Sequence, residues 1–105
     1  MGQFTIYENE NEHSRNTYPY FIAVQNELLD SLNSRMVIPL AQSQTIGQAV
    51  ISKLCPKIMI AEKEYIFLTH QMTNVPISAL NAPISDINID RDELFSALDF
   101  LITGI

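Results

Sequence analysis

The final stretch of the chain, residues 90–105, has the sequence DRDELFSALDFLITGI and carries the strongest helix signal. Asp90 is followed three residues later by Glu93, which is the spacing of a capping box and places acid at the positive end of the helix dipole. Apolar side chains then recur along one helical face, at Leu94, Phe95, Leu98, Leu101, Ile102 and Ile105. We therefore predict a helix over residues 90–105 that buries this stripe.

The opposite side of the predicted helix is polar, apart from one large aromatic residue, Phe100. Asp99 and Thr103 share that side, and the last turn contains no Lys or Arg to favour the negative end of the helix dipole. Two interpretations stay open from the helix alone. Either the stray Phe100 packs against a loop, or the exposed side and the chain terminus form a contact surface.

Length and composition indicate a globular protein with a single domain spanning residues 1–105. The chain of 105 residues is 47% hydrophobic and 17% charged, which supplies enough apolar material for a core. A net charge of −6 and a pI near 4.6 argue against direct binding to nucleic acid or to an anionic membrane. An acidic surface instead suits basic partners.

The sequence shows no signal for export or membrane insertion. One cysteine, Cys55, excludes an internal disulfide, and the first residues lack a basic segment followed by a long apolar run. No apolar run approaches the length of a membrane span. We expect a cytoplasmic protein.

About six short strands precede the helix, because β-branched and aromatic residues alternate with turn-forming stretches. The predicted strands are Gln3–Tyr7, Tyr18–Gln25, Arg35–Leu40, Lys57–Ile60, Tyr65–Thr69 and Val75–Leu80. Pro39 should cause a bulge or the loss of one ladder bond in the central strand. The pattern predicts a mainly β, α+β fold: a small, curled antiparallel sheet or partly open barrel packed on one helix. Its edges and its incompletely covered apolar face favour a homodimer.

Catalytic and metal-binding patterns are not evident in the sequence, so we predict no catalytic residue, metal or cofactor. Cys55 is interpreted as a small core residue, and Cys55 and His70 form no recognisable catalytic pattern. The acidic run Glu8–Thr17 is interpreted as a solvated loop. The adjacent pair Leu28–Leu29 leaves two alternatives open, a plug for the core or an exposed contact site.

Several segments together resemble the CcdB family of bacterial toxins, with similarity from end to end and a matching length. They are Gln3-Phe4-x-x-Tyr7, Val24-Gln25 with Leu28-Leu29-Asp30, Arg35–Leu40, Met72-x-x-Val75-Pro76 and the closing Gly104-Ile105. The resemblance implies a five-stranded, SH3-like antiparallel barrel with a small extra sheet and a C-terminal helix.

The resemblance also implies a function without enzymatic activity. CcdB-like toxins are homodimers that bind the A subunit of DNA gyrase and trap its covalent complex with cleaved DNA. A CcdA-like antitoxin neutralises the toxin, and the pair represses its own operon, so that contact with DNA occurs only through the antitoxin complex. No membrane and no cofactor is implied.

The family's site residues map onto the exposed side and end of the helix. The gyrase-binding positions are Asp99, Thr103, Gly104, Ile105, Leu28 and Leu29. The antitoxin-binding positions are Leu28, Leu29, Asp30, Asp99, Phe100 and Thr103. The best-known family pattern has Trp where this chain has Thr103 and Asn where it has Asp99. Because Trp is a typical hot-spot anchor, its replacement removes a few kcal/mol of binding unless other residues remake the contact.

Two alternatives belong to different classes. One is a MazF-like endoribonuclease on the same barrel, although six basic residues offer few cations for a scissile phosphate. The other is a non-toxic homologue that binds antitoxin but has lost its target.

Overall fold

A computed structural model describes residues 3–24, 28, 31–43, 54–84, 87 and 89–104. Seven strands in these ranges form one antiparallel sheet in the order β4-β5-β3-β2-β1-β7, with β6 paired to β3. The strands are β1 (Ile6–Asn9), β2 (Tyr20–Ala23), β3 (Ser34–Gln42), β4 (Lys57–Ile60), β5 (Lys63–Phe67), β6 (Thr73–Pro76) and β7 (Leu80–Ile84). Two short 3-10 helices, η2 (Thr69–Gln71) and η3 (Ile77–Ala79), flank β6, and helix α2 (Arg91–Thr103) follows the sheet.

The long strand β3 is central because it pairs with three others. Residues Val37–Leu40 pair with β2, while the two ends of β3 pair on the opposite edge with β6 and β5. The carbonyl oxygen of Pro39 accepts a hydrogen bond from the Leu68 N–H on that edge. The Pro39 nitrogen, which has no hydrogen to donate, is directed to the same edge, between the end of β5 and the start of β6. The predicted cost of this proline is thereby avoided, since no ladder partner stands opposite its nitrogen.

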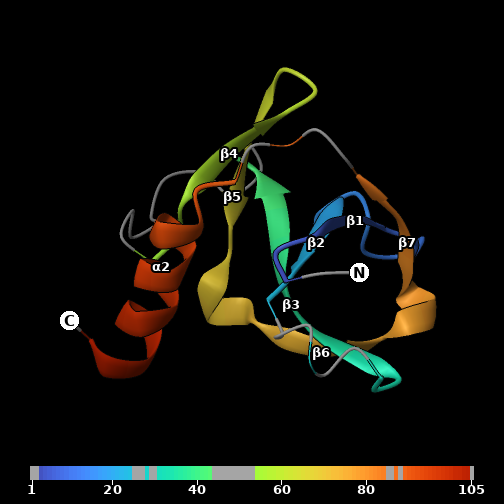
Figure 1. Ribbon diagram of the computed structural model, residues 1–105. Coiled ribbons are helices and arrows are strands. Elements are labelled where there is room, and N and C mark those ends of the chain that lie inside the picture. Colours follow the sequence, from blue (N-terminus) through green and yellow to red (C-terminus); the bar gives the residue numbers. More distant parts are fainter. Residues whose placement is uncertain are drawn as a thin grey trace.

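Strands β1, β2, β3, β6 and β7 curl into a barrel-like ring (Figure 1). Strand β7 pairs with β1, β6 pairs with β3, and η3 joins β6 to β7. All five strands contribute to one apolar cluster, which includes Tyr7, Phe21, Val37, Val75 and Leu80. This cluster fills the ring, and the predicted barrel-like α+β fold is confirmed.

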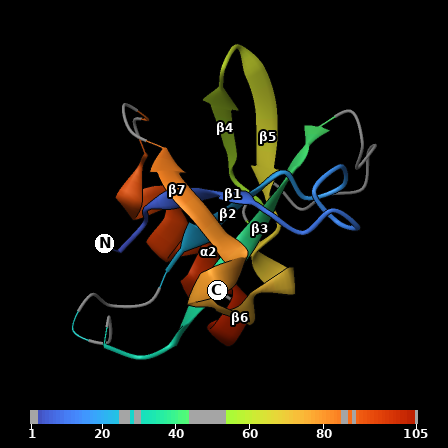
Figure 2. The same cartoon turned by 90° about the vertical axis from the view of Figure 1, so that its right-hand side faces the viewer.

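The β4–β5 hairpin extends the same sheet beyond the ring, where β5 pairs with the end of β3, so the small extra sheet implied by the resemblance is continuous with the ring (Figure 2). Ala61 and Glu62 form its tip with φ angles of 51° and 67°, the left-handed region in which most side chains are disfavoured. Two successive positive φ angles are the geometry of a type I′ turn, whose twist suits a two-residue hairpin.

The second core lies on the outer face of the sheet and is covered by α2. Alternate residues of the central strands point to it, as expected for a period of two, and Leu94 of α2 enters it. Its buried members include Ile6, Ile22, Ile38, Leu40, Tyr65, Phe67 and Leu94. Figure 1 shows α2 beside the sheet, on the opposite side from β7.

The structure corrects several predicted strand boundaries. The first strand begins at Ile6 and continues to Asn9, inside the segment interpreted as a loop. The predicted strand over 75–80 is wrong, because η3 separates β6 from β7 there. The loop of the hairpin is Ala61–Glu62 instead of the four residues 61–64 between the predicted strands, and β5 ends at Phe67 instead of Thr69.

The predicted burial of the helix stripe is correct only in part. Leu94 is buried and Leu98 is half-buried, but Phe95 is 42% exposed, Leu101 is 36% exposed and Ile102 is 76% exposed. The reason is geometric, since Phe95 and Ile102 lie on a different side of the helix from the buried residues Leu94 and Ala97. Ile105 is outside the described residues.

Candidate functional site

The C-terminal end of α2 is the candidate site, and its geometry follows from local sequence. Asp90 caps the start of the helix by accepting the Glu93 N–H at 3.1 Å, as predicted. Gly104 ends it in the left-handed conformation, with φ of 74°, and donates its N–H to the Phe100 carbonyl at 2.9 Å. Glycine adopts this conformation without a Cβ penalty, so the helix stops at a defined residue.

The helical repeat brings the predicted polar residues of the site together. Asp99, Thr103 and Gly104 are all exposed, and the Thr103 hydroxyl donates to the Asp99 carbonyl oxygen at 2.7 Å. Phe100, expected among polar neighbours, is half-buried. Asp99 and Thr103 are therefore exposed residues at a helix end that has no basic residue in its last turn.

Apolar side chains that were expected in the core join this surface. Ile102 is 76% exposed, and Phe95, seven residues earlier on the same side, is 42% exposed. We call the set Phe95, Asp99, Ile102, Thr103 and Gly104 the free side of α2. Sequence periodicity cannot separate a stripe covered by the chain itself from one left for a partner, which explains the missed assignment.

A cluster at the start of α2 fixes how the helix is presented. The Arg91 guanidinium lies 4.8 Å from the centre of the Phe4 ring and 5.8 Å from that of Phe95, and these two rings meet edge to face at 5.1 Å. Arg91 also donates to the Gln3 side chain at 3.1 Å, and Gln3 donates to the Val24 carbonyl at 3.2 Å. The cluster joins residues from opposite ends of the chain, so no local motif could have revealed it.

The other predicted site positions lie between β2 and β3. Leu28 is 85% exposed, which favours a contact residue over a core plug for this leucine. Leu29 and Asp30, like Ile105, lie outside the described residues.

Cys55 and His70 are brought together, although the sequence offered no pattern that pairs them. The Cys55 sulfur lies 3.7 Å from His70 Nδ1, and the thiol is 1% exposed. Burial raises the pKa of the Cys55 thiol, and a backbone hydrogen bond from Thr69 opposes the rise only in part. The thiol is therefore protonated and covered at neutral pH, the opposite of an activated nucleophile.

The described residues contain no group of three or more His, Cys, Asp or Glu side chains that could hold a metal ion. Within the same ranges, no helix is long and apolar enough to cross a membrane.

A comparison with known families decides the assignment. Residues 3–104 match the family described as CcdB protein, which is nearly the whole chain. This chain belongs to the CcdB family. It is accordingly a toxin of a toxin–antitoxin system.

The CcdB-like segment Arg35–Leu40 lies in β3 and serves the fold. Arg35 is 4% exposed and donates to the carbonyls of Leu32 and Ser34, which holds the chain at the entry to β3. Val37 and Ile38 are fully buried on opposite faces of the sheet. The positions where this CcdB chain departs from the best-known pattern, Asp99 and Thr103, are on the surface instead.

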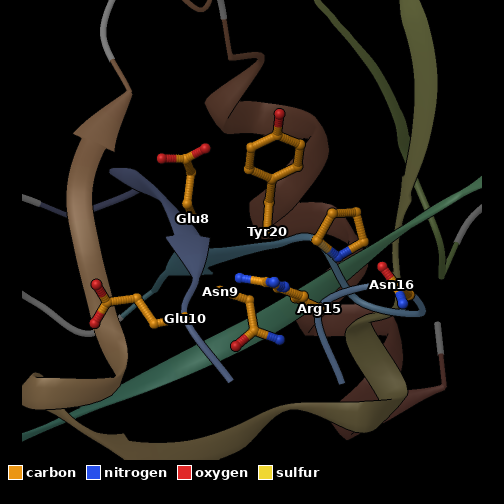
Figure 3. A pocket seen from close by; sticks show the side chains of 7 residues that line it. Glu8, Asn9, Glu10, Arg15, Asn16 and Tyr20 are labelled. Carbon is orange, nitrogen blue, oxygen red and sulfur yellow. The ribbon is translucent and has the colours of Figure 1, made fainter. Parts of the chain in front are cut away.

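A polar hollow of about 390 Å³ is lined by the loop that joins β1 to β2 and by the adjoining ends of both strands (Figure 3). Asn9 organises its loop by donating to Ser14 Oγ at 3.0 Å and to the Tyr18 carbonyl at 2.8 Å. Burial, followed by the neighbouring Tyr65, raises the pKa of Tyr20. Glu8 and Glu10 share this hollow with Arg15, so its charges are mixed and select no single ligand class.

Proposed function

We propose that this chain is a homodimeric toxin that binds the A subunit of DNA gyrase through the free side of α2. It holds gyrase in its covalent complex with cleaved DNA and so converts an essential cytoplasmic enzyme into a source of double-strand breaks. A CcdA-like antitoxin neutralises the toxin and, with it, represses the operon. The observation that carries this proposal is the exposed end of α2, where an acid, a glycine cap and uncovered apolar side chains adjoin.

The gyrase contact is assigned to Asp99, Thr103, Gly104 and Ile105, with Leu28 and Leu29. The Trp of the best-known pattern is absent, so apolar contact must come from other side chains of the free side. Ile102, which is 76% exposed, supplies it in this proposal. No step requires a nucleophile or general base, because the toxin acts by holding a larger enzyme in one state. We therefore propose that the protein has no enzymatic activity.

The antitoxin contact is assigned to Leu28, Leu29, Asp30, Asp99, Phe100 and Thr103, which overlap the gyrase positions. A net charge of −6 suits a partner that supplies basic residues, and such binding weakens as salt increases. The overlap at Asp99 and Thr103 means that antitoxin and gyrase compete for the end of α2. DNA is contacted only by the complex with the antitoxin.

Dimer formation is supported by apolar surface that the protomer leaves uncovered. Leu101 of α2 is 36% exposed and Leu32 is 49% exposed, and exposed apolar side chains of this kind mark interfaces. A two-fold dimer covers the same surface on both copies. Sedimentation equilibrium at several concentrations measures this association directly.

The decisive experiment is a cleavage-complex assay with purified gyrase, supercoiled plasmid and this protein. We expect linear DNA to accumulate after protein denaturation. Deletion of residues 104–105, or Thr103→Glu, should abolish the effect while the circular dichroism spectrum is unchanged. Asp92→Asn is the matched control, because Asp92 is an exposed acid at the other end of the same helix.

Three outcomes contradict the proposal. Full activity of the Thr103→Glu variant places the gyrase contact elsewhere. Specific RNA cleavage without gyrase-dependent DNA breakage favours the MazF-like alternative. If expression of this protein without antitoxin does not harm the cells, the chain is a non-toxic homologue.

A further inference from the structure

A second surface hollow lies between the β4–β5 hairpin and the start of α2, away from the free side. Its volume is about 450 Å³, and its two walls are distant in sequence, so no local sequence pattern indicates it. Half of its lining is apolar: Met59 is 59% exposed, Ile58 and Ile87 are half-buried, and Phe67 forms the buried floor. We call it the hairpin groove.

The hairpin groove follows a strand edge. Strand β4 stands at the end of the strand order and pairs with β5 alone among the described strands. Lys57, Ile58 and Met59 all line the groove, although consecutive strand residues point to opposite faces. Glu64 and Phe67 of β5 line it as well, so the hollow covers part of the hairpin beside α2 and reaches β4, whose outer edge has backbone N–H and C=O groups that can receive an added strand.

The charges around the hairpin groove select the occupant. Glu64, Asp90 and Glu93 contribute three carboxylates, against one ammonium group from Lys57. Lys57 Nζ lies 3.9 Å from Glu64 Oε1, so this ammonium group is paired within the protein, and both side chains are about half exposed. The groove therefore carries an excess of negative charge next to apolar surface.

We propose that the hairpin groove binds an extended peptide segment of a protein partner, one that carries both basic and apolar side chains. The segment pairs with the outer edge of β4, its apolar side chains cover Met59 and the floor, and its basic side chains approach Asp90 and Glu93. This site is separate from the end of α2, because Glu93 and Thr103 are ten residues apart along the helix, about 15 Å. The proposal consequently stands or falls independently of gyrase binding.

The test uses a fluorescein-labelled hexapeptide of alternating Arg and Val, titrated with the full protein in a fluorescence anisotropy assay. We expect saturable binding that is at least about tenfold tighter than for the Glu/Val peptide of the same length. Methylating alternate backbone nitrogens on one edge of the peptide should abolish binding, because it removes the donors that pair with β4. Amide chemical shifts should change in Lys57–Ile60.

Matched variants separate the groove from general acidity. Glu93→Lys should weaken peptide binding about tenfold, whereas Asp92→Lys, the same charge reversal in the same helical turn but outside the groove, should change it less than about twofold. Met59→Ala should weaken the binding that shifts the amides of Lys57–Ile60, and Ile102→Ala should not.

Several results overturn the proposal. Equal effects of Glu93→Lys and Asp92→Lys show attraction to net charge only. Unchanged binding after backbone methylation excludes pairing with the edge of β4, and shifts confined to the end of α2 place the peptide on the free side. If Glu93→Lys lowers helix content, the comparison of Met59→Ala with Ile102→Ala decides alone, and equal effects of those two refute the groove.

Discussion

Replacement of three leucines along α2 by alanine should destabilise the protein progressively less from the first to the last. Leu94 is 1% exposed and packs in the core between sheet and helix, so Leu94→Ala leaves a cavity and should cost about 3–5 kcal/mol. Leu98 is half-buried, and its truncation should cost about 1–2 kcal/mol. Leu101 is 36% exposed and should cost about 1 kcal/mol or less in the isolated protomer.

The measurement is denaturant unfolding followed by far-ultraviolet circular dichroism at several protein concentrations, since the chain has no Trp for fluorescence. The free energy of unfolding of the Leu101→Ala variant should approach that of the unmodified protein at low concentration. If a dimer covers Leu101, its deficit grows as concentration rises, because folding and association are then linked. A loss below about 1 kcal/mol for Leu94→Ala would refute the assigned core. So would equal losses for Leu94 and Leu101 in the protomer.

Three further changes test local features. Replacing Ala61 and Glu62 by Asn and Gly should increase the free energy of unfolding by about 0.5–1 kcal/mol, because both positions have positive φ angles. The midpoint of thermal unfolding should rise accordingly, and a lowered midpoint contradicts the turn assignment. Arg91→Ala should cost about 0.5–2 kcal/mol, since it removes the cation–π contact with Phe4 and a side-chain hydrogen bond; an unchanged denaturation midpoint would show the contact to be energetically neutral. Burial raises the pKa of the Cys55 thiol, so the folded protein holds this proton more tightly than the unfolded chain does. The free energy of unfolding should therefore fall as the pH rises above the ordinary thiol pKa, about 8.5. Cys55→Ala should remove that part of the decline.

Features with a local cause were predicted well from sequence. The cap at Asp90 needs only the residue three positions away, and the strand Arg35–Leu40 is a continuous apolar run, so both were located. The division between β6 and β7 was missed because Val75–Leu80 reads as one strand, while η3 turns the chain so that β7 reaches β1. Closure of a ring is a property of several strands together.

The same distinction explains the candidate sites. The exposed positions of Asp99 and Thr103 on α2 were predicted from helical spacing, and their role as contact residues stays a prediction from the family resemblance. The contact of Arg91 with Phe4, and the hairpin groove between β4 and α2, depend on how the sheet places segments that are far apart in the chain. Neither leaves a periodic signal, so only the folded arrangement reveals them.

The chemistry of the end of α2 has a consequence for which partner it prefers. The last carbonyls of a helix carry partial negative charge, and here the last turn has no basic residue to offset it, while Asp99 adds a full negative charge. A partner that brings Lys or Arg to this end therefore gains from the dipole and from the carboxylate together. Uncovered Ile102 beside them supplies apolar area that a charged partner alone cannot use. A segment that combines basic and apolar side chains satisfies both, and we propose this composition for the antitoxin segment that binds the end of α2.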